Sequence, residues 1–205
     1  MKSGPKAKDG FDISLTEVIG KDGHYFVLDE SSEKGKELTA KLDSETATDE
    51  QVKAADARVA SAELGMKRSM NTAGIKELLY HNHDHPNWTE IASRCLSCAN
   101  CTLVCPTCFC HTMEDTTDLT GDHTERWRRW DSCFSLDYSK VAGGNFRTSP
   151  KARYRQWMTH KLASWIDQFG TSGCVGCGRC ISWCPVGIDI TKEVEKIRNS
   201  PKTKS

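Results

Sequence analysis

Eight of the eleven cysteines in this chain fall into two copies of one spacing pattern. The copies consist of Cys95, Cys98, Cys101 and Cys105, and of Cys174, Cys177, Cys180 and Cys184. Both read C-x-x-C-x-x-C-x-x-x-C-P, because Pro106 and Pro185 follow the last cysteine of each copy. Thiolates with this spacing are the ligands of 4Fe–4S clusters in bacterial ferredoxins. Because the chain contains two complete copies, a chance match to the ferredoxin pattern is a poor explanation.

The spacing also predicts how the ligands are shared. Three cysteines separated by two residues wrap a short loop around three irons of a cube, and the fourth follows after the chain has turned away. In two-cluster ferredoxins that fourth cysteine binds the other cluster. We therefore predict one cluster held by Cys95, Cys98, Cys101 and Cys184. The second cluster is predicted to be held by Cys174, Cys177, Cys180 and Cys105.

Small residues inside the motifs fit this role. Gly176 and Gly178 lack a Cβ atom, which lets backbone N–H groups approach the sulfides of a cluster. Ser97 and Ala99 are their small counterparts in the first motif. We therefore expect each loop to wrap tightly around its cluster.

Three cysteines lie outside the motifs, and their role is open. Cys108, Cys110 and Cys133 are candidates for a further metal site, together with His111. The alternative, which we favour, is that they are small buried residues near a cluster, as free cysteines often are. The tract His81, His83 and His85 also resembles a metal ligand set, but it precedes Pro86 in a polar stretch and is expected to lie in a solvated loop.

Four-cysteine zinc sites are the main alternative to iron–sulfur clusters. Zinc sites commonly use two C-x-x-C pairs, whereas each motif here has three evenly spaced cysteines and a Cys-Pro. The pattern therefore favours two 4Fe–4S clusters and electron transfer over a zinc-stabilised interaction module.

The elements that must position these loops are mostly helices. Apolar spacing and capping residues predict helices from Thr48 to about Met70, from Thr72 to Tyr80, from Asn87 to the first motif, over residues 151–169 and from Thr191 to Asn199. Alternation over residues 11–28 predicts a β-hairpin with a turn at residues 20–23. In the helix at 151–169, Lys161 is expected among the charged side chains away from the apolar side.

The segment between the motifs, residues 106–173, is long for a ferredoxin. It contains Trp127, Trp130, Trp157 and Trp165 among several arginines. Such mixing can stack on nucleic-acid bases, but we favour core packing and subunit contact.

Composition sets the remaining limits. The 205 residues carry 28 Lys and Arg against 28 Asp and Glu, so net charge gives no reason to expect a nucleic-acid partner. The N-terminus shows no signal peptide and no apolar run long enough to span a membrane, so we expect a cytoplasmic protein. We divide the chain into residues 1–47, a tail, hairpin and linker, and residues 48–205, a ferredoxin-type dicluster domain.

Several segments together resemble a known family. They are residues 94–98, 105–110, 118–122, 128–134, 153–155 and 173–180. The chain resembles the 4Fe–4S dicluster beta subunit of cytosolic nickel–iron hydrogenases of the sulfhydrogenase type, together with the corresponding iron–sulfur subunit of anaerobic sulfite reductase. The likeness runs from about Phe11 to about Val194 and covers the extra cysteines.

The resemblance implies a fold and a role in passing electrons between partner subunits. The implied fold is mainly α, an α-helical-ferredoxin-like dicluster domain with a small β element near the N-terminus. Members of the family usually have a further N-terminal portion, so residues 1–47 are expected to be the remnant of a larger domain. The implied partners are a flavoprotein subunit that binds FAD and NAD(P)H, and a catalytic redox subunit.

Three functions therefore compete. The leading one is a non-catalytic electron-transfer subunit of a nickel–iron hydrogenase, since no nucleotide-binding motif and no acid–base or nucleophile arrangement is present. The first alternative is the corresponding iron–sulfur subunit of an NADH-dependent anaerobic sulfite reductase. The second is the zinc-stabilised interaction module.

Overall fold

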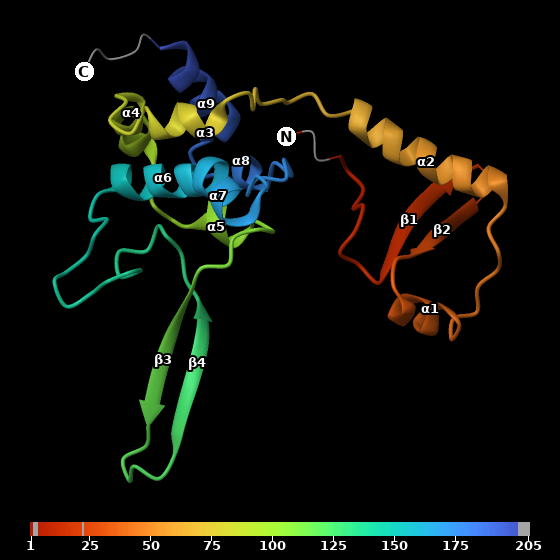
Figure 1. The fold of residues 1–205 in the computed structure, drawn as a ribbon, viewed down its shortest axis with the longest axis horizontal. Helices are drawn as coiled ribbons and strands as arrows, with labels where there is room; N and C mark the ends of the chain where they lie inside the picture. The colour runs from red at the N-terminus through yellow and green to blue at the C-terminus, as the bar shows by residue number, and fades with distance from the viewer. Residues whose placement is uncertain (2–3, 22, 201–205) are drawn as a thin grey trace. The chain divides into compact units, whose positions relative to one another are not determined.

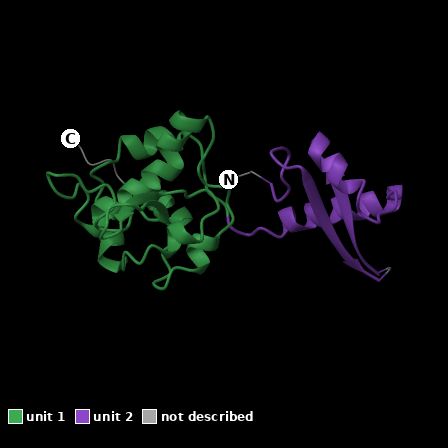
Figure 2. Cartoon of the chain, turned by 90° about the horizontal axis from the view of Figure 1, so that it is seen from below, with its two compact units in different colours: residues 1, 69–205 green, residues 2–68 purple. Residues whose placement is uncertain are grey.

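The computed structural model describes residues 1, 4–21 and 23–200. The chain forms two compact units, residues 2–68 and residues 69–205 together with Met1 (Figure 2). Residues 48–68 lie in the N-terminal unit, and the functional division at residue 47 stays a prediction.

The N-terminal unit is a β-hairpin with two helices. Strand β1 (Ile13–Gly20) pairs antiparallel with β2 (Gly23–Glu30), which confirms the predicted hairpin. Helix α1 (Glu33–Thr39) begins at Ser32, whose hydroxyl accepts the Gly35 N–H. Helix α2 (Asp49–Leu64) begins with the predicted capping box between Thr48 and Gln51, with both reciprocal hydrogen bonds formed.

The larger unit contains the remaining helices. They are α3 (Ile75–Tyr80), α4 (Asn87–Arg94), α5 (Asn100–Leu103), α6 (Pro150–Thr159), the π-helix η1 (His160–Ser164), α7 (Trp165–Phe169), α8 (Arg179–Ser182) and α9 (Ile190–Asn199). The predicted helix over 151–169 is thus one run of α6, η1 and α7, and it ends at Gly170 with φ 72°, as expected for a C-terminal cap.

The core of this unit lies where α4, α6, η1 and α9 meet. Trp88, Ile91, Met158 and Leu162 are fully buried there, and Val194 packs with them from α9. Helices α4 and α9 are also joined by Glu193, whose buried carboxylate accepts from Arg94 at 2.9 Å. This core holds the helices that lie directly before and after the cysteine motifs.

A second hairpin contradicts the expectation of a mainly α fold. Strand β3 (His111–Thr117) pairs antiparallel with β4 (Thr124–Trp130), from His111↔Trp130 to Thr117↔Thr124. It projects from the helices of the larger unit (Figure 1). Helices make up 38% and strands 16% of the structure, in two separate two-stranded sheets. The mainly α prediction is therefore wrong.

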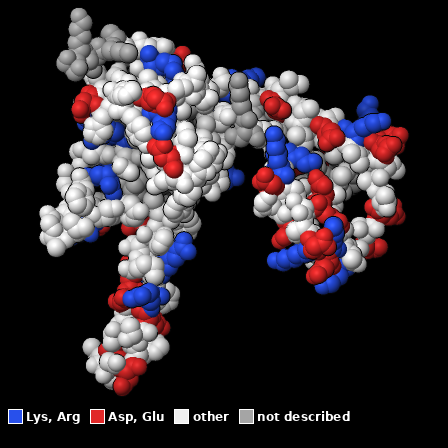
Figure 3. Space-filling model, viewed as in Figure 1, with Lys and Arg blue, Asp and Glu red and all other residues white. Residues whose placement is uncertain are grey.

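The second hairpin escaped prediction because it buries almost nothing. Its strands are polar and largely exposed, so they lack the alternation that marks a half-buried strand. Cross-strand ion pairs join them instead: Arg126 contacts both carboxylate oxygens of Asp115, at 2.7 and 2.9 Å, and Arg129 contacts Glu114 at 2.9 Å. Acidic and basic side chains accordingly lie together along the hairpin (Figure 3).

Two further expectations from the sequence need correction. Trp157 is buried at 3% exposure, as expected for core packing. Core packing is wrong for Trp127 and Trp130, which lie on the hairpin with 47% and 70% exposed, and subunit contact there stays a prediction. In the histidine tract, His85 is not solvated: it is 3% exposed, and its Nδ1 accepts the Asn87 N–H at 3.1 Å.

Candidate metal centre

The loop of the first motif is wound by two residues in a left-handed conformation. Ser97 has φ 52° and Ala99 has φ 65°, although neither is glycine. The turn brings the Ser97 N–H to 3.4 Å from the Cys95 sulfur. Non-glycine residues rarely adopt this conformation, and such outliers persist where the surrounding structure requires them. Here the conformation turns the loop around its own thiols.

The second motif repeats this backbone. Gly176 and Gly178, at the positions that correspond to Ser97 and Ala99, have φ 76° and 73°. Each loop then enters a four-residue helix, α5 in the first motif and α8 in the second, and these two helices pack against each other. The two motifs are therefore local repeats in structure as well as in sequence.

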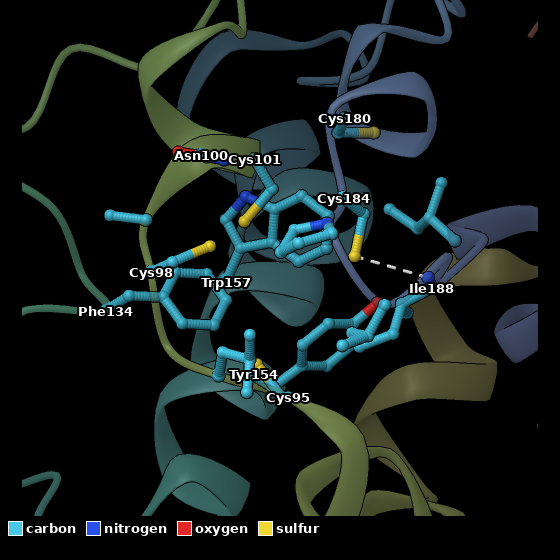
Figure 4. A pocket seen from close by; sticks show the side chains of 15 residues that line it. Cys95, Cys98, Asn100, Cys101, Phe134, Tyr154, Trp157, Cys180, Cys184 and Ile188 are labelled. Carbon is cyan, nitrogen blue, oxygen red and sulfur yellow. Dashed lines mark hydrogen bonds between the residues drawn. The ribbon is translucent and has the colours of Figure 1, made fainter.

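One cavity receives thiols from both motifs. Its wall includes Cys95, Cys98 and Cys101 from the first loop and Cys180 and Cys184 from the second, and it encloses roughly 450 Å³ of empty space, counting its open mouth. In Figure 4 the sulfurs of Cys98, Cys101 and Cys184 point into this space, whereas that of Cys180 is turned away from them. Four of the five thiols on this wall, Cys95, Cys98, Cys101 and Cys184, are the set predicted for the first cluster, whereas Cys180 was predicted for the second.

The rest of that wall is mostly apolar. Phe134, Tyr154, Trp157 and Ile188 line it, and the Ile188 N–H donates to the Cys184 sulfur at 3.3 Å (Figure 4). Apolar walls limit water access, and N–H donors to sulfur stabilise a negatively charged cluster. Within the described part of the chain, no group of three or more His, Cys, Asp or Glu side chains is placed to hold a single metal ion. Thiols spread around a cavity suit a cubane, whose four irons each take one thiolate, and the residues therefore fit a 4Fe–4S cluster.

Cys105, the last cysteine of the first motif, has a different environment. The Lys161 Nζ donates to its sulfur at 3.1 Å, and the Thr107 hydroxyl lies 3.2 Å from the same atom. A hydrogen bond from Cys108, assisted by Thr107 and the charge of Lys161, lowers the pKa of Cys105 to about 4 against the opposing effect of burial. Cys105 is therefore a thiolate at neutral pH even before metal binds.

Three other thiols of the two motifs behave in the opposite way. Burial raises the pKa of Cys101 and Cys174, and it raises the pKa of Cys180 to about 12. These groups are protonated in the metal-free chain at neutral pH. Cluster binding must therefore displace their protons, which couples assembly to pH.

Lys161 is the site residue that sequence reasoning placed wrongly. It is 3% exposed rather than on the solvated side of its helix, and it lies in the π-helix η1. Its Nζ donates to Cys105, to Thr107 at 3.1 Å and to the Gly173 carbonyl at 3.2 Å. Burial lowers its pKa, but the neighbouring thiols Cys108 and Cys105 outweigh this and leave the pKa raised. No periodicity in the sequence signals this role.

The extra cysteines meet at a second, smaller cavity. Cys108, Cys110 and Cys133 line it together with His160 and Lys161, and it encloses about 310 Å³ by the same measure. His111, which the sequence grouped with them, is exposed and does not line this cavity. A hydrogen bond from Cys133 lowers the pKa of Cys110 to about 6, against burial. Whether these thiols bind a metal or have only a structural role stays a prediction.

Comparison with known proteins agrees with this geometry. Residues 94–188 match the family described as a 4Fe–4S dicluster domain. The chain is 34% identical over 195 residues to sulfhydrogenase 2 subunit beta of Pyrococcus furiosus, an alignment that covers 94% of this chain and 56% of that protein. The chain thus spans about half the length of this relative. No solved structure gave a significant match.

Proposed function

Because this chain belongs to the family of 4Fe–4S dicluster proteins related to the sulfhydrogenase beta subunit, we propose that it is an electron-transfer subunit of a nickel–iron hydrogenase. The observation that carries the proposal is the cavity lined by thiols of both motifs. A bound cluster there supplies one-electron chemistry, and its reduction requires no proton donor or nucleophile from the chain.

The proposed ligands follow from the sequence and are supported by the geometry. Cys95, Cys98, Cys101 and Cys184 would hold one cluster, and Cys174, Cys177, Cys180 and Cys105 the other. The placement of Cys184 on the cavity of the first loop supports crossed ligation. Crossed ligation would also tie the two loops together, since each cluster then joins residues from both ends of the larger unit.

The chain's own residues would control access to the clusters. Phe134, Tyr154 and Trp157 would keep water from the first cluster, while the Ile188 N–H would donate to a ligand sulfur. Three apolar residues within the motifs are exposed, with between 59% and 64% of their surface accessible: Leu96, Leu103 and Trp183. Such residues suit a surface on which a partner brings its own redox centre close.

The partners and setting are part of the proposal. A flavoprotein subunit that binds FAD and NAD(P)H would exchange electrons with these clusters, and a nickel–iron catalytic subunit would lie at the other end of the relay, in the cytoplasm. The chain itself would be non-catalytic. Among the described residues, no helix is long and apolar enough to cross a membrane.

The sulfite reductase alternative shares the same site. The corresponding iron–sulfur subunit of an anaerobic sulfite reductase would use the same clusters with a different catalytic partner. The relative found by sequence comparison is a sulfhydrogenase subunit, which favours the hydrogenase branch. The identity of the catalytic partner therefore distinguishes the hydrogenase assignment from the sulfite reductase assignment.

Anaerobic purification of the chain with its natural partners tests the proposal. We expect about eight irons per chain, an EPR signal on reduction, and copurification with a flavoprotein and a nickel–iron subunit. A sulfite reductase catalytic subunit in their place would move the assignment to the alternative branch. Two zinc ions and no iron would overturn electron transfer and leave the interaction module.

A further inference from the structure

We propose that Lys161 raises the reduction potential of the cluster bound through Cys105, by holding a buried positive charge against that cysteine's sulfur. This inference rests on the proposed function, because it requires Cys105 to be a cluster ligand. It assigns a specific electrostatic task to a residue outside both cysteine motifs.

The three donors of the Lys161 ammonium are all used within this site. They reach the Cys105 sulfur at 3.1 Å, the Thr107 hydroxyl at 3.1 Å and the Gly173 carbonyl at 3.2 Å. Across the described chain, Lys161 forms no ion pair with an Asp or Glu carboxylate. At 3% exposure its charge is shielded from water and is left to act on the thiolate.

The backbone is shaped to keep the ammonium there. The π-helix η1 leaves the Lys161 carbonyl free to accept the Gly173 N–H at 2.9 Å, and Gly173 directly precedes Cys174. A Cβ at Gly173 would lie 2.6 Å from the Trp165 ring, so glycine alone permits this approach. π-helical turns of this kind are frequent at functional sites. One turn of chain thus fixes Lys161 against Cys105 and against the start of the second motif.

The cysteine that corresponds to Cys105 in the second motif is Cys184. Among the residues that the structure describes, its sulfur accepts a neutral backbone N–H, from Ile188 at 3.3 Å, and no hydrogen bond from a charged side chain. The buried guanidinium of Arg153 approaches the first loop at Ser97 Oγ, 3.5 Å away, rather than at a cysteine sulfur. The two repeats therefore differ in the charge beside their fourth thiolate.

This difference acts on the electron that each cluster accepts. Reduction transfers one electron from a flavin-type donor and adds one negative charge to a site already carrying four thiolates. A nearby ammonium in a weakly screened interior stabilises the reduced form more than the oxidised form. Removal of this charge should therefore lower the potential of the cluster at Cys105 and leave the other cluster almost unchanged.

An EPR-monitored redox titration of the iron-loaded full chain tests the inference. The variants are Lys161→Met, Lys161→Arg and, as a matched control, Lys53→Met, which removes an exposed lysine from α2 in the other unit. The cluster at Cys105 is identified as the one whose signal changes in Cys105→Ser. We expect Lys161→Met to lower the potential of that cluster alone, Lys161→Arg to restore it towards the wild-type value, and Lys53→Met to shift neither cluster.

Each result bears on the inference. A Lys161→Met chain that holds both clusters at wild-type potentials overturns it. If Lys161→Met loses the cluster, Lys161→Arg decides: retention near the wild-type potential supports a role for charge, whereas the same loss shows a purely structural role and overturns the inference. A wild-type chain without iron would instead refute the proposed function, so the two failures are distinguishable.

Discussion

Ala99 and Gly178 occupy the same position in the two cysteine loops, and both adopt a left-handed backbone, with φ 65° and 73°. Each directly follows the second cysteine of its motif and precedes the short helix that carries the third. The loop geometry is therefore imposed by the fold rather than chosen by glycine, since alanine adopts it at a cost.

The first prediction uses this pair. Gly178→Ala should destabilise the chain by about 1 kcal/mol, because a left-handed residue with a Cβ is strained although no atom lies within 4 Å of the added Cβ. Ala99→Gly should change stability by less, since relief of strain is offset by the larger unfolded-state entropy of glycine. Anaerobic urea unfolding measures both. Equal and large losses in the two variants would contradict the shared backbone requirement.

The second prediction concerns the sharing of ligands between the motifs. Cys184→Ala should lower iron content to about half and remove the same EPR signal as Cys98→Ala, because both sulfurs point into one cavity. Cys105→Ala should instead remove the same EPR signal as Cys177→Ala. As a control, Cys133→Ala should leave the iron content unchanged if that thiol is structural. If Cys184→Ala and Cys177→Ala instead removed the same EPR signal, the ligation would not be crossed.

The third prediction concerns the carboxylate that joins α4 to α9. Glu193 is 3% exposed and accepts from Arg94 at 2.9 Å and from Asn87 at 3.1 Å. Glu193→Ala should cost about 2–3 kcal/mol, because Arg94 loses one of its two carboxylate partners and the buried Asn87 side chain loses its acceptor. The neighbouring exposed Glu195 provides the control, and Glu195→Ala should stay within about 0.5 kcal/mol. Urea unfolding of the loaded chain distinguishes them, and similar losses would refute a specific role for Glu193.

The fourth prediction is a pH dependence that arises from His85. Burial lowers the pKa of its ring below the usual 6.5, and protonation of Nδ1 would remove the acceptor of the Asn87 N–H. Since the folded pKa lies below the unfolded one, the unfolded chain binds more protons as the pH falls. Stability should therefore be full above pH 6.5 and decline as the pH falls through 6.5 towards the folded pKa.

Thermal unfolding midpoints at pH 7.5 and 5.5 measure this dependence. His85→Gln should reduce the difference between the two midpoints, whereas His83→Gln, which alters an exposed ring two residues earlier, should leave it intact. An unchanged difference in the His85→Gln chain would assign the pH dependence to other groups.

Features that depend on short chain segments can be read from the amino-acid sequence alone. The spacing of Cys95, Cys98 and Cys101 dictates a loop around one ligand, because two-residue gaps leave few ways to arrange three thiols. The capping box of Thr48 and the Gly170 terminus of α7 are equally local, since each involves groups within a few residues.

The residues that lie beside those loops come from distant parts of the chain and follow from its folding. Lys161 and Cys105 are 56 residues apart, and their contact depends on burial and on the π-helical turn, neither of which leaves a periodic trace in the sequence. The hairpin of β3 and β4 was not predicted for a related reason: its strands pair through the backbone and through exposed contacts such as Arg126 with Asp115, and they bury no continuous apolar face. Local spacing selects the ligands, whereas packing between distant segments sets the charge and the solvent access around them.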